Sequence, residues 1–306
     1  MDTSSTTITY NKSIKDLVHQ TIFIIGAPRT GTSFFGNLLG SYNNIEFYHE
    51  PYLFNNLLNV SSEMPLNTFK KIFYSYIFED LFFNSITGRS INTNKYDISS
   101  IYNYKSKKEV ENRLNQKNNR NLIITKYKKN KLVIKTIYPI NKFKNIFSKI
   151  YNFNKIIIYR NLNDTINSML KKKWFKDNDN IISMGEFYQI KNNNVFPIFL
   201  DKKNFNYWQS LNELDKCAYY YLIHYKSISN INNYISIDYD TFNSNKNLIV
   251  KEIENKFNLK KGPKTKEIIN NFKNSKSETD AVSKINKTIM RNIYKLKSNN
   301  INIKFY

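Results

Sequence analysis

A glycine-containing turn near residue 30 has the composition of an anion-binding loop. After a short apolar run, the chain reads Gly-Ala-Pro-Arg-Thr-Gly-Thr-Ser over residues 26–33. The two glycines have the spacing of a Walker loop, but Thr32 stands where the phosphate-binding lysine would be. Backbone N–H groups, the start of a following helix and the Arg29 cation suffice for a single phosphate. The loop therefore favours a ligand with less charge than a nucleoside triphosphate, which normally comes with Mg²⁺.

A second anion site is predicted at the end of another apolar run. Arg160 follows that run, and Ser168 lies further on in a segment with a helical pattern. A planar guanidinium can bind a phosphate dianion through two parallel hydrogen bonds, and a hydroxyl can add another. An arginine followed by an Asn/Asp helix cap is also an ordinary structural feature. The presence of both motifs in one chain favours the binding interpretation.

Sulfotransferases bind 3′-phosphoadenosine 5′-phosphosulfate (PAPS) with two motifs, and the two motifs of this chain resemble them and occur in the same order. The string Ala-Pro-Arg-Thr-Gly-Thr-Ser-Phe-Phe resembles the 5′-phosphosulfate loop, and Arg29 matches its carbohydrate and tyrosylprotein variant. The string that begins at Arg160 resembles the family's 3′-phosphate motif at every fixed position. The resemblance covers roughly residues 20–60 and 130–260. It implies a sulfotransferase nearest to the carbohydrate type, with a P-loop-like three-layer α/β fold.

The resemblance assigns roles to individual residues. Arg29 is expected at the bridging oxygen of the donor, Thr32 and Ser33 at its 5′-phosphate, and Phe34 and Tyr239 near the adenine. Lys135, in the strand-end string Lys-Thr-Ile, is expected over the sulfuryl group. PAPS is the implied co-substrate and 3′-phosphoadenosine 5′-phosphate (PAP) the product, with no metal. The expected donor site comprises Arg29, Thr30, Gly31, Thr32, Ser33, Phe34, Arg160, Ser168 and Tyr239.

The base that deprotonates the acceptor is not where the phenol and steroid sulfotransferases have it. Those enzymes carry a histidine two residues after the lysine, and Ile137 stands there in this chain. Glu50, in the string Phe-Tyr-His-Glu-Pro, is the expected base, because the carbohydrate and tyrosine enzymes have a glutamate after the loop. His49 is the alternative, since an imidazole titrates near neutral pH. The catalytic set is thus Glu50 or His49, with Arg29 and Lys135 stabilising negative charge.

One family feature is missing. The C-terminal Arg-Lys-Gly clamp on the 3′-phosphate is not found, because the Lys-Lys-Gly string at residues 260–262 comes too early. Three later cations are candidates to replace it, and nothing in the sequence chooses among Lys284, Lys287 and Arg291.

Short apolar runs rich in β-branched or aromatic residues are expected to form the parallel strands that position these groups. They cover residues 21–25, 132–136, 155–159 and 234–239, and a further strand is expected just before His49. Helical patterns at residues 32–39, 164–172 and 248–257 follow three of the runs. The alternation predicts a doubly wound α/β fold, whose ligands bind at the carboxyl ends of the strands.

Two polar stretches interrupt this pattern within what we expect to be a single domain of 306 residues. Residues 84–130, with one expected helix at 107–116, and residues 173–204 are interpreted as insertions. Loops of such length near strand ends usually form lids or substrate walls, and disorder is the alternative. The acceptor is expected to be a glycan or a small molecule held by these walls.

Composition limits the other classes of function. The net charge of +23 would suit a polyanion binder, but the lysines are scattered and Lys, Asn, Ile, Tyr and Phe are all over-used, as in an A/T-rich coding sequence. A specific nucleic-acid partner is therefore not expected. A kinase-like phosphotransferase on a P-loop scaffold and a non-catalytic polyanion-binding protein remain the alternatives. A single cysteine, Cys217, and the lack of a long apolar run predict a cytoplasmic protein without a membrane span.

Overall fold

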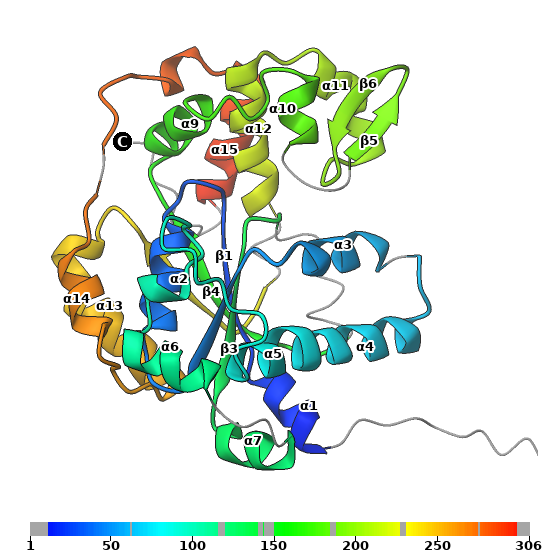
Figure 1. Ribbon diagram of the computed structural model, residues 1–306. Coiled ribbons are helices and arrows are strands. Elements are labelled where there is room, and N and C mark those ends of the chain that lie inside the picture. The colour runs from blue at the N-terminus through cyan, green and yellow to red at the C-terminus, as the bar shows by residue number, and fades with distance from the viewer. Residues whose placement is uncertain are drawn as a thin grey trace, which may run out of the picture.

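Five parallel strands form the centre of the fold. The computed structural model describes residues 12–61, 63–115, 120–139, 143, 150–183, 188–226, 231–274 and 276–298. The sheet has the strand order β2-β3-β1-β4-β7 (Figure 1). The strands are β1 (Ile22–Gly26), β2 (Ile45–His49), β3 (Lys131–Thr136), β4 (Asn154–Tyr159) and β7 (Tyr234–Asp238). This arrangement confirms the predicted parallel sheet, with strand boundaries shifted by a residue at most from those expected.

Both faces of the sheet are buried, which explains the nearly continuous apolar runs. Along β1, Phe23 and Ile25 belong to one hydrophobic cluster, and Ile22 and Ile24 belong to the other. Successive side chains of a strand point to opposite faces, so a strand covered on both sides needs apolar residues at every position. The alternation places the central strand between two helical layers.

Helices cover each face of the sheet (Figure 1). The cluster around Phe23 includes residues of α1 (Lys12–His19), α3 (Tyr52–Val60), α4 (Leu66–Ser75), the π-helix η1 (Tyr76–Phe83), α5 (Asn84–Ile86), α7 (Arg120–Tyr127), α9 (Leu162–Leu170), α12 (Glu213–Tyr225) and α15 (Lys287–Ser298). The cluster around Ile22 includes residues of α2 (Thr32–Gly40), α6 (Lys107–Leu114), α13 (Phe242–Phe257), α14 (Thr265–Asn270) and the 3₁₀-helix η2 (Ile101–Asn103). The fold is therefore a three-layer α/β fold.

A helical group and a small hairpin lie above the carboxyl ends of the strands (Figure 1). The group contains α9, α10 (Asn178–Ile182), α11 (Phe205–Gln209), α12 and α15, with 3₁₀ turns at η3 (Lys202–Asn204) and η5 (Val282–Lys284). The hairpin pairs β5 (Tyr188–Lys191) with β6 (Asn194–Pro197). Asn192 and Asn193 have φ values of 51° and 60°, the left-handed conformation that a tight two-residue hairpin turn requires.

The two polar stretches contain more regular structure than the sequence predicts. In residues 84–130, the expected helix is present as α6, but α7 is a second helix that was not expected. Its Ile-Ile-Thr core is β-branched, which hides a helix from propensity arguments. In residues 173–204, the expectation of irregular structure was wrong, because α10 and the β5–β6 hairpin form there.

A buried charge network attaches the first polar stretch to the sheet. The carboxylate of Glu46 on β2 pairs with both terminal nitrogens of Arg113 on α6 and also accepts hydrogen bonds from Ser85 and Asn130. Glu46 and Arg113 are 1% and 6% exposed. The loss of either partner would leave a charge buried without compensation, so this network helps to fix the stretch in place.

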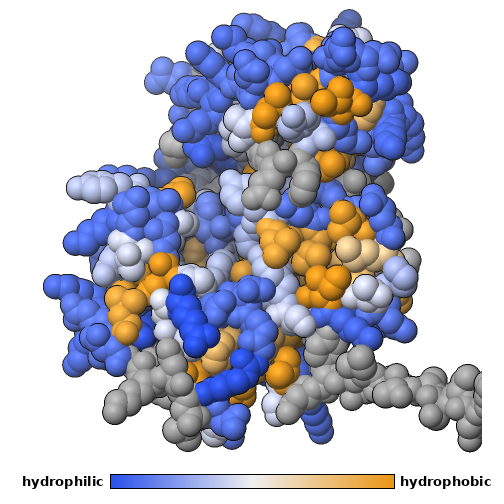
Figure 2. Space-filling view, turned by 45° about the vertical axis from the view of Figure 1, so that its right-hand side comes forward, coloured by the Kyte–Doolittle hydropathy of each residue, from blue (hydrophilic) through white to orange (hydrophobic). Residues whose placement is uncertain are grey.

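The surface is mainly hydrophilic, with apolar side chains gathered in places on the face shown in Figure 2. Large exposed apolar side chains include Leu53 on α3 and Leu66 on α4. Within the part of the chain that the structure describes, no helix has the length and apolar character to cross a membrane.

Candidate active site

The predicted site residues converge at the carboxyl edge of the sheet. Arg29 belongs to the loop after β1, Glu50 follows β2, and Lys135 lies near the end of β3. Arg160 follows β4, and Tyr239 follows β7. Because all five strands are parallel, their ends meet at one edge. The sheet therefore gathers residues that are widely separated in sequence.

Two residues of the loop after β1 have a left-handed backbone conformation. Arg29 and Gly31 have φ values of 70° and 90°. A Cβ atom on Gly31 would lie 2.0 Å from Cδ2 of Tyr239, so the ring of Tyr239 packs directly against this glycine. A left-handed conformation at a non-glycine residue such as Arg29 costs free energy and is found preferentially at functional sites.

The Thr30 side chain stabilises the loop from within. Thr30 is fully buried, and its hydroxyl donates to the carbonyl oxygen of Ala27 at 2.6 Å. The Tyr225 hydroxyl accepts from the N–H of Ala27 at 3.0 Å and donates to the carbonyl oxygen of Ile158 at 2.7 Å. The hydroxyl of Thr30 is thus engaged inside the loop, its place in the donor site stays a prediction, and Tyr225 is a loop-supporting residue that the sequence did not reveal.

Helix α2 begins at Thr32, immediately after the loop. The side chain of Thr32 is buried, whereas Ser33 is partly exposed and its Oγ lies 3.2 Å from Nε2 of His49. Phe34 packs edge-on against Phe35, Phe242 and Phe272, and Phe272 also contacts Tyr239. The two expected adenine-binding aromatics thus belong to one aromatic cluster beside the loop.

The two phosphate motifs are in direct contact. Nε of Arg29 donates to Oγ of Ser168 at 2.9 Å, and Nη1 of Arg160 donates to the carbonyl oxygen of Arg29 at 3.0 Å. The Arg160 guanidinium lies 5.1 Å from the ring centroid of Tyr239. Asp164 and Asp240 approach it at 4.0 and 3.9 Å. This geometry brings together the residues that the sequence assigned to the two ends of one ligand.

Lys135 joins the two candidate bases. Its ammonium pairs with the Glu50 carboxylate and lies 3.5 Å from Nε2 of His49. The backbone N–H of Glu50 donates to the carbonyl oxygen of Lys135 at 3.0 Å, and Glu50 has a φ of 49°. Strand pairing thus holds Glu50 in the left-handed region beside Lys135. The carboxylate of Glu50 and the imidazole of His49 therefore both lie beside this ammonium.

Burial and mutual repulsion perturb the charges of the site. Burial, followed by repulsion from Arg29, lowers the pKa of Lys135 to about 7. The Glu50 carboxylate opposes that shift, since an opposite charge favours the ammonium. Loss of hydration, followed by repulsion from Arg160, lowers the pKa of Arg29. Burial, and then Lys135, lowers the pKa of His49 to about 4, so its imidazole is neutral at pH 7. An anion bound between these cations would relieve the repulsion.

The C-terminal part of the chain returns to the Arg160 motif through residues that the sequence did not indicate. The N–H of Ser277 donates to Asp164 at 2.6 Å, and the N–H of Ala281 donates to the Asn163 side chain at 2.7 Å. Lys276 lines a pocket of about 470 Å³ together with Asp164 and Asp240. The suggested cations Lys284, Lys287 and Arg291 are exposed on η5 and α15. Among the described residues, Lys276 is thus a cation of this segment that lines the same pocket as Asp164 and Asp240, and nothing in its sequence context marked it.

No group of three or more His, Cys, Asp and Glu side chains suited to a metal ion occurs among the described residues. His224, one of the three histidines, is fully buried in α12, where its ring packs against Tyr220 and Tyr225.

Comparison with known proteins gives a fold-level likeness only. No protein-family model matches the chain, and no curated protein matches it significantly. Among solved structures, the chain is similar to the sulfotransferase domain of the olefin synthase from Synechococcus PCC 7002. The identity is 9% and the TM-score 0.40, over 94% of this chain and 90% of that chain. At this level of similarity, the function must be argued from the site.

Proposed function

We propose that this protein is a sulfotransferase that transfers a sulfuryl group from PAPS to a hydroxyl group of a carbohydrate. The observation that carries the proposal is the cluster of Arg29, Lys135 and Arg160 around one loop. Burial, and then repulsion between the cations, lowers the pKa of Arg29 and of Lys135, so the cluster would be stabilised by a ligand with several anionic groups. A nucleotide with both a 3′-phosphate and a 5′-phosphosulfate meets this requirement.

The residues of the site suit the parts of such a donor. Arg160 and Ser168 would bind the 3′-phosphate, since a buried guanidinium next to a hydroxyl suits a dianion. The loop N–H groups, the start of α2 and Ser33 would bind the 5′-phosphate. Tyr239 and Phe34, which belong to the aromatic cluster, would contact the adenine.

Arg29 and Lys135 would stabilise the charge that develops during transfer. In the proposed reaction, the acceptor oxygen bonds to sulfur as the bond between sulfur and the bridging oxygen breaks. The electron pair of that bond leaves with the phosphate, and the acceptor proton passes to Glu50. Positioned cations of this kind usually supply the largest part of an enzyme's rate enhancement. His49 is the second candidate for the base, because its neutral imidazole shares Lys135 with Glu50.

The carbohydrate acceptor is proposed from three features of the chain. Arg29 replaces the lysine of the phenol and steroid enzymes, Ile137 replaces their histidine, and Glu50 lies beside Lys135. A base that comes from the end of β2 in place of β3 approaches the acceptor from a different strand of the sheet.

The proposal is tested by thermal stabilisation with PAP and with adenosine 5′-phosphate, in the absence of Mg²⁺. We expect PAP to raise the melting temperature more than adenosine 5′-phosphate does, because only PAP carries the 3′-phosphate. Arg160→Ala should abolish the difference. Arg120→Ala is the matched control, since Arg120 forms an exposed ion pair with Glu79.

Three results would contradict the proposal. Equal stabilisation by the two nucleotides would contradict the proposed 3′-phosphate site. A larger effect of ATP with Mg²⁺ would favour a phosphotransferase. Strongly salt-dependent binding of heparin without nucleotide binding would favour a polyanion-binding protein.

A further inference from the structure

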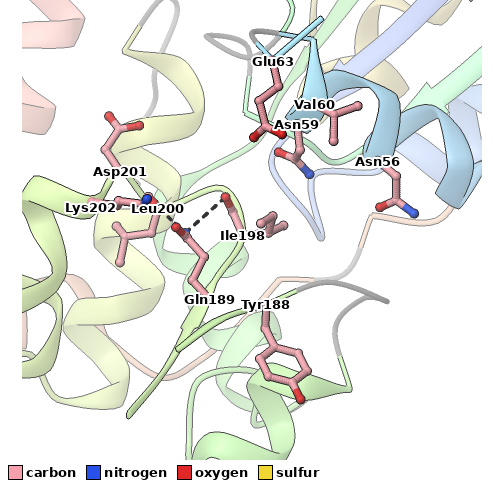
Figure 3. A pocket seen from close by; sticks show the side chains of 10 residues that line it. All are labelled: Asn56, Asn59, Val60, Glu63, Tyr188, Gln189, Ile198, Leu200, Asp201 and Lys202. Carbon is pink, nitrogen blue, oxygen red and sulfur yellow. Dashed lines mark hydrogen bonds between the residues drawn. The ribbon is translucent and has the colours of Figure 1, made fainter. Parts of the chain in front are cut away.

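A pocket of about 340 Å³ lies between α3 and the β5–β6 hairpin. Figure 3 shows Asn56, Asn59 and Glu63 on the side of α3, facing Gln189 and Asp201 from the hairpin and the segment that follows it. The volume lies in the range of small-molecule binding sites. None of the residues with a proposed role in transfer lines this pocket.

Helix α3 connects the pocket to the reactive residues. The helix begins two residues after Glu50, and its Asn59 side chain donates to the hydroxyl of Tyr138 at 2.9 Å. The side chain of Asn55 lies 3.4 Å from the hydroxyl of Thr136, the residue after Lys135. With a rise of about 1.5 Å per residue, Asn59 lies about 12 Å along the helix from Pro51. One helix thus extends from the proposed base to the pocket.

We infer that this pocket is a distal acceptor subsite that binds a neutral or amine-bearing sugar ring. A hydroxyl of a neighbouring ring of the same acceptor would then reach Glu50 and Lys135. A single ring does not span the length of α3, so the acceptor must contain at least two rings. This inference rests on the proposed sulfotransferase function and extends it to the size and charge of the acceptor.

The charge of the pocket opposes that of the rest of the protein. The chain as a whole carries a net charge of +23. The pocket is lined by the two acidic residues Glu63 and Asp201 and by one basic residue, Lys202. A sulfated or uronic-acid ring would meet an excess of like charge there, whereas a neutral or protonated amino sugar would not. The pocket therefore selects against the polyanionic acceptors that the overall charge would attract.

The remaining lining suits a hydroxylated ring. Nε2 of Gln189 donates to the carbonyl oxygens of Pro197 and Leu200 at 3.0 and 2.8 Å, which holds its side chain in place. Oδ1 of Asn59 is buried and accepts no hydrogen bond from the described residues. A buried acceptor of this kind is stabilised when a hydroxyl or a water molecule donates to it. Val60 and Ile198 supply apolar surface for the C–H face of a ring.

Binding is tested by calorimetry and saturation-transfer NMR without a donor. The probes are the glucosamine dimer, the N-acetylglucosamine dimer and its monomer, and a hyaluronan disaccharide, which carries a carboxylate. We expect both dimers to bind about tenfold or more tightly than the monomer and the hyaluronan disaccharide. Glu63→Lys and Asp201→Lys should each weaken binding of the glucosamine dimer by about three- to tenfold. Glu111→Lys makes the same charge change on α6 and should have no effect.

Equal binding of monomer and dimers would overturn the inference, as would equal effects of Glu63→Lys, Asp201→Lys and Glu111→Lys. Thermal stabilisation by PAP distinguishes a failure of the subsite inference from a failure of the proposed function. Selective stabilisation by PAP without binding of either dimer would contradict the subsite inference alone. No selective stabilisation by PAP would remove the sulfotransferase proposal itself.

Discussion

Nε of Arg29 donates a hydrogen bond to Oγ of Ser168 at 2.9 Å, across 139 residues of sequence. The bond links the loop after β1 to helix α9, which follows the neighbouring strand β4. Both residues were predicted to bind the donor, Arg29 at its bridging oxygen and Ser168 at its 3′-phosphate. Their contact means that the two proposed phosphate sites are held together by side chains as well as by the sheet.

Ser168→Ala is expected to weaken PAP binding by about tenfold or more, since a hydrogen bond to a charged group contributes about 1.5–3 kcal/mol. The affinity for adenosine 5′-phosphate should change much less, because that nucleotide lacks the 3′-phosphate. Calorimetric titration of both nucleotides measures the difference. Ser183→Ala is a suitable control, because the Ser183 hydroxyl is exposed and donates to the nearby carbonyl oxygen of Asn180. Equal losses for the two nucleotides would mean that Ser168 acts through Arg29 alone.

Binding of PAP is expected to weaken as the pH rises above about 7. Burial, and then the charge of Arg29, lowers the pKa of Lys135 to about 7, while the Glu50 carboxylate opposes that shift. In the ligand-free protein this lysine therefore loses its proton between about pH 7 and its ordinary range. Lys135 attracts the donor phosphate in its protonated form and not in its neutral form. Binding of PAP must therefore take up a proton at higher pH. The dissociation constant of PAP, measured from pH 7 to 9.5, should rise in the wild type and stay flatter in Lys135→Arg. Parallel curves for the two proteins would exclude this role.

Replacement of the base should reduce turnover more than donor binding. We expect Glu50→Gln to lower the single-turnover rate of sulfuryl transfer from PAPS to the N-acetylglucosamine dimer by about 10²–10⁴-fold. The affinity for PAP should change much less than the rate, because Glu50 is proposed to act on the acceptor and affects the donor only through its ion pair with Lys135. His49→Gln, the matched variant on the other side of Lys135, should have a much smaller effect on the rate. The reverse order of the two variants would assign the base to His49.

His224 is expected to make the protein sensitive to acid. Burial lowers its pKa to about 3, and neither ring nitrogen has a hydrogen-bond partner among the described residues. The unfolded chain takes up a proton at His224 near pH 6.5 and the folded chain does not, so the free energy of unfolding decreases as the pH falls below 6.5. At pH 5 the loss is about 2 kcal/mol relative to pH 8.

Urea denaturation at several pH values measures this effect. His224→Phe and His224→Leu should each remove that part of the pH dependence, whatever they do to the stability at pH 8. An unchanged pH dependence in both variants would contradict the prediction.

Arg113→Ala is expected to destabilise the fold by about 3–5 kcal/mol, because it leaves the Glu46 carboxylate buried without its main partner. Arg120→Ala removes the exposed pair with Glu79 and should cost only about 0–1 kcal/mol. Urea denaturation of both variants measures the contrast. Similar losses in the two variants would show that the buried network has no special role in holding residues 84–130 to the sheet.

The sheet could be predicted because its strands are covered on both faces. Runs such as that of β1 have apolar residues at every position, and their β-branched content separates them from helices. Two of the helices that the sequence did not reveal, α7 and α12, lack a clear period. Helix α12 contains three consecutive tyrosines, Tyr219, Tyr220 and Tyr221, and most of its residues are buried, so no polar face marks it. The β5–β6 hairpin is short and its turn residues are common in this Asn-rich chain.

The amino-acid sequence by itself determined which residues lie at the strand ends. The loop at residues 26–33 and Arg160 follow apolar runs, and Lys135 lies near the end of another. Parallel strands bring these ends to one edge whatever the rest of the chain does. Only the tertiary structure decided how these side chains are paired. The contact between Arg29 and Ser168 and the ion pair between Lys135 and Glu50 depend on strand order and on left-handed backbone at Arg29 and Glu50.

The return of Ser277 to Asp164 and the pocket beside α3 were likewise decided by the tertiary structure. They join segments that are far apart in sequence and carry no local signal. Hydrophobic periodicity reports which face of an element is buried, but polar contacts between distant segments depend on how the elements pack together.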